Sequence, residues 1–368
     1  MDVNIETIWW GRSAAARLAR ILLMPLSWVF AMISTARTMF YRRGWLHREQ
    51  VEIPVVSVGN LSVGGTGKTP LVTWLAIRLR IEGFHPVVVS RGYGGKARRP
   101  VVINFDPAWT LPAEFGHRVF RPRSYFEAFD AAGDEAVLIA RRAGCPVVVF
   151  RDRAEACRTA RDCYEPDCIL LDDGFQHLRL RRDLDIVILA KRDAESYRLP
   201  AGPLREGLDA LARADVVVHV GDSVSEPSMR RVAAGLVARP DADAEVESLQ
   251  KIRGKTIGAV AAIADPREFF CMLEAAGAHL VVRRRFRDHY DYTIEDWQRI
   301  EKEAAEAGAE MVVTTEKDLV KLERFAGVGS SLRAIRLDLE VSGGEELVAR
   351  IGALDANHGH PHDRSAVA

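Results

Sequence analysis

The chain has 368 residues, of which 28% are charged and 48% hydrophobic, and Lys plus Arg balance Asp plus Glu at 51 each. This length is enough for two domains with separate cores. The balanced charge provides no basic field, which argues against a nucleic-acid partner. The five cysteines have no metal-type spacing, and we expect free thiols in a reducing compartment.

The first fifty residues differ in composition from the rest. Residues 21–36 carry no charge, Arg residues flank this run on both sides, and Trp residues are interleaved. The run is shorter than the roughly 20 apolar residues of a membrane span, and Pro25 would kink a helix there. We expect residues 1–50 to form a helical segment associated with an anionic membrane surface. A helical hairpin packed on the protein body is the alternative.

The stretch that follows has the pattern of a phosphate-binding P-loop. An apolar run at 55–58 predicts a buried strand, a Gly-rich turn and Lys68-Thr69 come next, and a helical pattern begins after them. Glycines let backbone N–H groups turn toward phosphate oxygens, and Lys68 would reach the β- and γ-phosphates. The standard pattern has Gly five residues before Gly67, where this chain has Ser62. The predicted nucleotide-binding residues are Ser62, Val63, Gly64, Gly65, Thr66, Gly67, Lys68 and Thr69.

From residue 51 onward, apolar strand patterns alternate with helical ones, which predicts an α/β fold with a mostly parallel sheet. We expect a P-loop NTPase-like α/β/α domain over 51–240 and a second, smaller α/β domain over 250–345. Residues 96–130 are interpreted as a long irregular excursion. The polar stretch 222–252 is a plausible boundary, and 356–368 is expected to be a disordered tail.

Several polar residues follow strands or precede helices, where this fold usually carries catalytic and binding residues. Asp172-Asp173 ends an apolar strand, as a metal-binding carboxylate does in P-loop enzymes, although an Asp at a strand end is often a turn former. Asp134 begins a helix, where an N-cap is the alternative role. Arg91 and Tyr93 follow a strand in a Gly-rich turn and could clamp phosphate or substrate, or simply form the turn. Residues 288–292 crowd titratable groups, including His289, before a helix.

A set of motifs then carries a resemblance to a known family. They occur in this order: Gly59-Asn-Leu-Ser-Val-Gly-Gly-Thr-Gly-Lys-Thr-Pro70, Ser90-Arg-Gly-Tyr-Gly-Gly95, Gly133-Asp-Glu135, Asp172-Asp-Gly-Phe-Gln-His177, Pro200-Ala-Gly-Pro-Leu-Arg-Glu206, Asp288-His-Tyr290 and Thr314-Thr-Glu-Lys-Asp318. Together with the basic, apolar N-terminus, they resemble the tetraacyldisaccharide 4′-kinases, the lipid A 4′-kinases of Gram-negative bacteria. The resemblance spans roughly residues 10–340.

The resemblance implies a function and a location. It implies transfer of the ATP γ-phosphate to the 4′-hydroxyl of an acylated glucosamine disaccharide, which makes lipid IVA in lipid A biosynthesis. The partners would be this lipid substrate and the cytoplasmic face of the bacterial inner membrane. It also implies two α/β/α domains with the site between them.

The resemblance also implies roles for particular residues. Asp134 matches the family's catalytic carboxylate and His289 its partner from the second domain, so we expect the pair to form when the domains close on substrate. With ATP we expect Mg²⁺, held by Thr69 and by Asp172 or Asp173, with Glu135 as a further candidate. The candidates for substrate binding are Arg91, Tyr93, Gln176, His177, Arg205 and Glu206.

Two other functions are considered. A P-loop GTPase or metallochaperone would usually carry Asn-Lys-x-Asp after a strand, whereas this chain has Ala190-Lys-Arg-Asp193. A membrane-attached, non-enzymatic nucleotide-binding scaffold would not need Asp134 and His289.

Overall fold

The computed structural model describes residues 5–92, 98–107, 109, 110, 112, 115, 118–221, 225–325 and 331–358. The chain forms two compact units. Unit 1 comprises Met1–Arg91, Asp152–Arg230 and Val341–Ala368, and unit 2 comprises Gly92–Arg151 and Arg231–Glu340. The sequence grouped 92–151 with the P-loop domain, whereas its contacts group it with 231–340.

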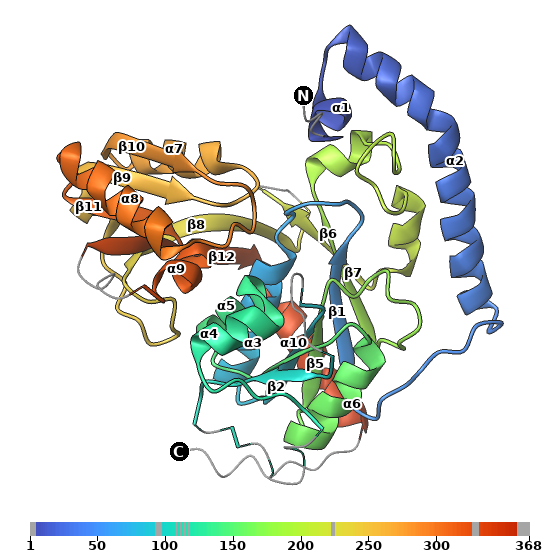
Figure 1. Ribbon diagram of the computed structural model, residues 1–368. Coiled ribbons are helices and arrows are strands. Elements are labelled where there is room, and N and C mark those ends of the chain that lie inside the picture. Colours follow the sequence, from blue (N-terminus) through green and yellow to red (C-terminus); the bar gives the residue numbers. More distant parts are fainter. Residues whose placement is uncertain are drawn as a thin grey trace. The chain divides into compact units, whose positions relative to one another are not determined.

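Unit 1 contains a parallel sheet with the strand order β7-β6-β1-β5-β2 (Figure 1). The strands are β1 (Val55–Asn60), β2 (Pro86–Ser90), β5 (Cys168–Asp172), β6 (Leu184–Leu189) and β7 (Val216–Val220). The helices are α3 (Lys68–Ile81), α6 (Arg153–Tyr164) and α10 (Gly344–His358), with short 3-10 helices at Lys191–Glu195 and Leu208–Arg213. β1, β2 and β5 are buried throughout, which explains their continuous apolar runs.

The N-terminal segment of unit 1 forms α1 (Ile5–Trp10) and α2 (Ala14–Arg42). Ser13 caps α2 by accepting a hydrogen bond from the backbone N of Ala16, and the helix continues through Pro25. The expected helix is therefore present, but it is longer than the uncharged run alone suggested. By length and composition, α2 is the one helix among the described residues that could cross a membrane.

Unit 2 contains the strand order β10-β9-β11-β12-β8, in which β10, β9, β11 and β12 pair in parallel. The strands are β8 (Ser228–Val237), β9 (Thr256–Ala261), β10 (His279–Arg285), β11 (Met311–Thr315) and β12 (Leu332–Ser342). The helices are α7 (Pro266–Ala275), α8 (Ile294–Glu306) and α9 (Glu316–Leu322), with a 3-10 helix at Leu249–Ile252. Separate apolar cores lie around Trp297 and around Phe270.

Segment 92–151 also belongs to unit 2 and carries a candidate site residue. It forms β3 (Val101–Ile103) and β4 (Val147–Val149), which pair antiparallel, and the helices α4 (Tyr125–Ala132) and α5 (Asp134–Ala143). Arg141 of α5 pairs with Asp241 and Glu323, and Arg142 pairs with Glu316. These ion pairs, together with the packing of α5 on α9, explain why the segment groups with the later part of the chain.

The α/β fold with mostly parallel strands is confirmed, and some local expectations are wrong. The region 96–130, interpreted as irregular, contains β3 and most of α4. The polar stretch 222–252 contains β8, and the two units divide within it, between Arg230 and Arg231. The helix α10 extends to His358, so residues 356–358 of the expected tail are helical; the remainder lies outside the described residues.

Candidate functional site

The P-loop connects β1 to α3 in unit 1. Gly64 and Gly67 have φ values of 117° and 99°, a region that glycine enters without strain. Ser62, the departure from the standard pattern, pairs with Leu204 in an antiparallel bridge, and the Val63 N–H donates to the Pro203 carbonyl at 2.8 Å. The loop therefore gains its shape partly from the 200–206 segment and does not need glycine at position 62.

Lys68 is the first residue of α3, and its ammonium faces the end of β1. Its Nζ donates to Asn60 Oδ1 at 3.0 Å and lies 3.7 Å from Asp173 Oδ1. Asn60 in turn donates from Nδ2 to Thr66 Oγ1 at 2.7 Å. The lysine is thus held beside the loop, at the place from which it would contact phosphate oxygens.

Asp172 and Asp173 follow β5 in the same unit. Asp172 is buried, accepts a hydrogen bond from Ser90 Oγ at 3.5 Å, and its carbonyl accepts one from Arg153. Arg205 Nη1 lies 3.0 Å from both carboxylate oxygens of Asp173. Burial acts to raise the pKa of Asp173, but Lys68 and Arg205 outweigh it, so the pKa lies below its ordinary value.

These groups fit a nucleotide and a divalent cation. The first N–H groups of α3 have no acceptor within the helix, and no atom lies within 4 Å of a Cβ built at Gly64 or Gly65, so the loop is open where phosphates would lie. Among the described residues there is no group of three or more His, Cys, Asp or Glu that could hold a metal. The hydroxyl of Thr69 and the two aspartates nevertheless offer the oxygen ligands that Mg²⁺ uses together with water.

The candidate substrate residues have different surroundings. Gln176 Nε2 donates to the Asn60 carbonyl at 2.8 Å, and its Oε1 lies 3.4 Å from Arg205, so both residues adjoin Asp173. Burial lowers the pKa of His177 to about 4, which leaves it neutral at pH 7. Glu206 is buried and pairs with Arg213 at 2.5 Å.

Two further substrate candidates, Arg91 and Tyr93, and the metal candidate Glu135 lie in other segments of the chain. Arg91 ends unit 1 and is exposed, and Tyr93 lies outside the described residues. Glu135 belongs to unit 2, where its carboxylate lies 3.4 Å from Lys317 Nζ. The contacts of Gln176 and Arg205 thus place these two candidates beside Asp173 at the end of β5.

Asp134 and His289 form a second group, in unit 2. Gly133 precedes α5 without a side-chain cap, and Asp134 is the first residue of the helix, with 4% of its surface exposed. His289 Nδ1 lies 3.1 Å from Asp134 Oδ1, which also accepts the Glu135 N–H at 2.9 Å. His289 has a φ of 56°, which is unusual for a residue with a side chain. Because both residues lie in one unit, the expectation that they meet only on domain closure is wrong.

Two lysines of α9 surround this pair, and the sequence interpretation gave them no role. Lys321 Nζ lies 3.3 Å from Asp134 Oδ2, and Lys317 Nζ lies 3.0 Å from His289 Nε2. Both belong to the segment that begins Thr314-Thr-Glu-Lys-Asp318, where their four-residue spacing places them on one face of a helix. That spacing was the available signal, but the packing of α5 on α9 could not be predicted from it.

The charges explain the protonation states of the pair. Burial acts to raise the pKa of Asp134, but the hydrogen bond with His289 and the charges of Lys317 and Lys321 hold the pKa far below its ordinary value. The bond to Asp134 raises the pKa of His289. Asp134 is therefore a carboxylate at neutral pH, with a defined partner on each oxygen.

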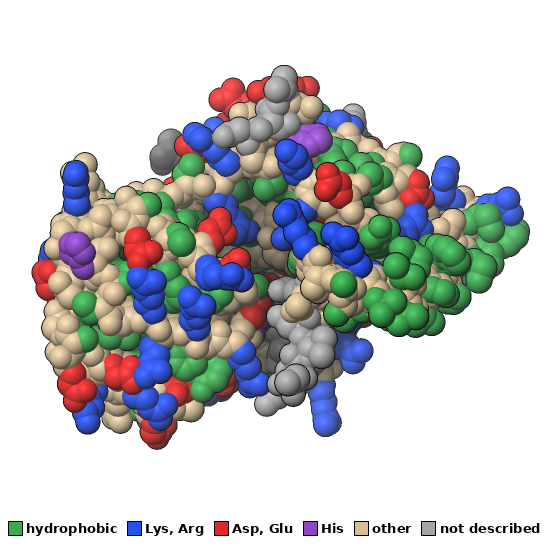
Figure 2. Space-filling model, turned by 90° about the horizontal axis from the view of Figure 1, so that it is seen from above, with side chains coloured by type: hydrophobic (Ala, Val, Ile, Leu, Met, Phe, Trp, Pro, Cys, Tyr) green, Lys and Arg blue, Asp and Glu red, His purple; other side chains and the backbone are tan. Residues whose placement is uncertain are grey.

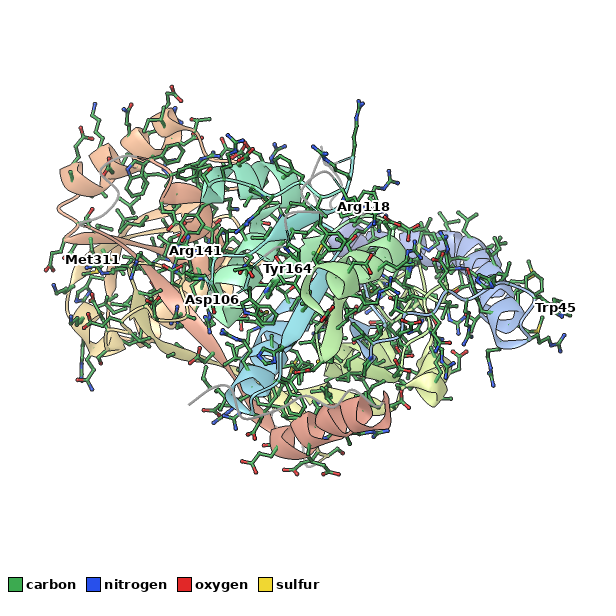
Figure 3. The ribbon with its side chains drawn as sticks, turned by 90° about the horizontal axis from the view of Figure 1, so that it is seen from below. Trp45, Asp106, Arg118, Arg141, Tyr164 and Met311 are labelled. Carbon is green, nitrogen blue, oxygen red and sulfur yellow. The ribbon has the colours of Figure 1, made fainter. Side chains whose placement is uncertain are left out.

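α2 provides a large apolar surface to unit 1. Its exposed hydrophobic side chains are Leu18, Ile21, Leu22, Leu26, Trp28, Val29, Met32 and Ile33. Figure 2 shows hydrophobic side chains crowded over this helix, with Lys and Arg side chains around them. Trp45, also exposed, lies beyond the end of α2 at the edge of the unit (Figure 3).

On its other side, α2 contacts the body of unit 1. Ser27 Oγ donates to the Arg198 carbonyl and accepts the Ala201 N–H, both at 3.0 Å. Trp9 Nε1, from α1, donates to the Pro200 carbonyl at 3.0 Å. The helix is thus attached along a narrow line, and its apolar face remains exposed.

Known proteins resemble this chain in sequence and in fold. The family model described as tetraacyldisaccharide-1-P 4′-kinase matches residues 19–354. A tetraacyldisaccharide 4′-kinase from Aeromonas salmonicida is 39% identical over 330 residues, 88% of each chain. One from Thiobacillus denitrificans is 41% identical over 324 residues, 83% of this chain and 88% of its relative. A crystal structure of LpxK from Aquifex aeolicus in complex with ATP superimposes with a TM-score of 0.71 and 29% identity, covering 90% of this chain and 99% of that one.

Proposed function

The chain belongs to the tetraacyldisaccharide-1-P 4′-kinase family and is a lipid A 4′-kinase; we propose that it carries out this reaction with the P-loop of unit 1 and the Asp134–His289 pair of unit 2. The donor is ATP, and the acceptor is the 4′-hydroxyl of a tetraacylated glucosamine disaccharide 1-phosphate. The new bond joins the 4′-oxygen to the γ-phosphorus, the bond to the ADP oxygen breaks, and the product is lipid IVA. The observation that carries the proposal is the buried Asp134 carboxylate in contact with His289.

The residues of unit 1 bind and orient the nucleotide. Backbone N–H groups at the start of α3 donate to phosphate oxygens, and Lys68 exchanges its contact with Asn60 for the β- and γ-phosphates. Gln176 and Arg205 adjoin Asp173 and bind polar groups of the substrates beside the P-loop. Glu206 serves the fold through Arg213 and is not part of this set.

Thr69, Asp172 and Asp173 hold Mg²⁺ in this proposal, directly or through water. When bound, the cation neutralises charge that moves onto the leaving phosphate oxygens. Asp173 is ionised because Lys68 and Arg205 lower its pKa, so it is ready to act as a ligand. Glu135 is less suited to this role, because it contacts Lys317.

Asp134 takes the proton from the 4′-hydroxyl. A sugar hydroxyl is a poor nucleophile, so its proton must leave as the new bond to phosphorus forms. Asp134 is ionised at every pH near neutrality, and His289 fixes the direction of its carboxylate. Because its pKa is low, Asp134 accepts the proton late in the transfer, when the oxygen has become acidic.

The apolar face of α2 lies in the membrane surface, where the lipid substrate resides. Apolar burial and attraction of the flanking Arg residues to anionic headgroups both favour this position. We place the enzyme on the cytoplasmic face of the bacterial inner membrane, since ATP is supplied from that side.

Incubation with ATP, Mg²⁺ and the acylated disaccharide 1-phosphate tests the proposal. We expect a product heavier by one phosphoryl group, with ATP preferred over GTP in a competition assay. Nucleotide hydrolysis without a phosphorylated lipid, or a preference for GTP, would instead support the GTPase alternative. Nucleotide binding without turnover would support the scaffold.

A further inference from the structure

Lys321 is a buried lysine that contacts two carboxylates in unit 2. Only 1% of it is exposed, and its Nζ lies 3.3 Å from Asp134 Oδ2 and 3.1 Å from Asp318 Oδ1. The ring of Tyr292, itself fully buried, lies 5.7 Å from the same ammonium. A buried ammonium is costly unless it is paired, so its position is determined by these contacts.

Asp318 forms the second ion pair of the lysine. Its Oδ2 accepts the Ala262 N–H at 2.9 Å and the Thr315 hydroxyl at 2.8 Å, which leaves Oδ1 to face Lys321. Asp318 is therefore anchored by the backbone after β9 and by the residue that caps α9. Lys321 therefore links Asp318 to Asp134, the first residue of α5.

The two oxygens of Asp134 have different partners among the described residues. Oδ1 accepts the Glu135 N–H and contacts His289, so both of its lone pairs are engaged. Oδ2 contacts Lys321 and retains a lone pair. It is thus the oxygen that can receive a proton, and Lys321 determines where it lies.

We propose that Lys321 is a positioning residue for the kinase reaction: anchored by Asp318, it holds Asp134 Oδ2 in the direction from which that oxygen accepts the hydroxyl proton. This inference rests on the proposed role of Asp134 as the base. Lys317, four residues earlier, contacts His289 on the outer side of the pair and does not replace this function.

The test separates the positioning of Asp134 from support of the fold. Lys321→Met retains roughly the length of the side chain but leaves two buried carboxylate oxygens, Asp134 Oδ2 and Asp318 Oδ1, without their cation, so it should lower the melting temperature. The double variant Lys321→Met with Asp318→Asn removes one of the stranded charges and should recover most of that loss. Lys302→Met, at an exposed lysine of α8, is the control for a lysine-to-methionine change and should retain the wild-type kcat.

We expect kcat of the double variant, per folded molecule, to stay about 100-fold below wild type, because a misdirected catalytic group costs that order of rate. KM for ATP should change less than about twofold, since the P-loop is untouched. In an Asp134→Asn background, the same pair of substitutions should cost no further turnover. Asp318→Asn alone should lower kcat, but less than the double variant does, because Lys321 loses its charged anchor while it keeps its contact with Asp134.

Each other outcome is informative. Recovery of melting temperature and kcat together in the double variant, with Asp134→Asn inactive, would show that Lys321 serves the fold and overturn the inference alone. A further loss in the Asp134→Asn background would also overturn it, because Lys321 would then act elsewhere. Normal turnover by Asp134→Asn would overturn the base role and this inference with it.

Discussion

Lys68 contacts Asn60 and Asp173 where a phosphate would take their place. Its substitution by Ala removes the one side-chain charge of the P-loop aimed at the β- and γ-phosphates. We expect kcat to fall by about 10²- to 10³-fold, the cost of losing one donor to developing charge. Steady-state phosphorylation of the lipid measures this, with Lys251→Ala as an exposed-lysine control. Near wild-type turnover in Lys68→Ala would refute the P-loop assignment.

Asp134 and His289 should act as a unit. Asp134→Ala should lose most of kcat while ATP still binds, and His289→Ala should lose less. The double variant should be no slower than Asp134→Ala, because His289 orients a carboxylate that is no longer there. Single-turnover rates of the four proteins measure this coupling. Fully multiplicative losses would show that the two residues work separately.

The same pair predicts a pH dependence of stability. Asp134 raises the folded-state pKa of His289 above its ordinary value of 6.5. A raised pKa contributes stability that is complete below 6.5 and is lost as the pH rises through the folded value. The stability advantage of wild type over His289→Gln should therefore be largest near pH 6 and shrink toward pH 9, measured by denaturant unfolding. An advantage that grows with pH would contradict the pairing.

How far individual residues could be predicted depended on how local their contacts are. The P-loop is one continuous stretch, so its glycines and Lys68 were recognisable from spacing. Asp134 and His289 were each singled out from their own segments, but their pairing was expected only through the family resemblance, because they lie 155 positions apart. Lys321 and Asp318 were missed as site residues, since nothing in their own segment shows that α5 packs against α9.

At the scale of elements, strands buried on both faces were readily predicted, whereas β8 was not. β8 lies within a polar stretch and is buried only at its two ends, with exposed and half-buried residues between them, so no period-2 pattern marks it as a strand. Pro25 predicted a kink in the N-terminal helix; α2 continues through this residue, and Ser27, two residues later, bonds it to the body of unit 1. Ser27→Ala should destabilise unit 1 by about 1–2 kcal/mol, because the Ala201 N–H loses its acceptor.

The exposed face of α2 should carry membrane attachment. Leu22 and Met32 are 69% and 66% exposed, so changing both to Glu should leave the fold intact and reduce binding to anionic vesicles by more than about 10-fold. The control is Ile81→Glu at the end of α3, where the side chain is 66% exposed outside this face. Vesicle flotation measures the bound fraction. Full binding by the α2 variant would assign attachment to another surface.

At the scale of the whole molecule, the sequence indicated two α/β bodies and grouped segment 92–151 with the P-loop domain, whereas its contacts cluster it with 231–340. The deciding contacts are Arg141 with Asp241 and Glu323, and Arg142 with Glu316, and no local pattern distinguishes these arginines from solvent-exposed ones. As a consequence, nucleotide binding and proton transfer are assigned to residues of different units.

The Lys68 and Asp134 variants should therefore differ in how ATP affects their stability. ATP should raise the melting temperature of the Lys68 variant less than that of wild type, and it should raise that of the Asp134 variant as much as that of wild type, measured by thermal unfolding.

The position of the transferred phosphoryl group tests the central claim most directly. The enzyme is given ATP labelled in the γ-phosphoryl group and, in parallel, the acylated disaccharide 1-phosphate and its analogue lacking the 4′-hydroxyl. The account predicts label as a 4′-phosphate ester on the first, none on the analogue, and loss of the product in Asp134→Asn. Label at another hydroxyl, on the analogue, or undiminished in Asp134→Asn would contradict it.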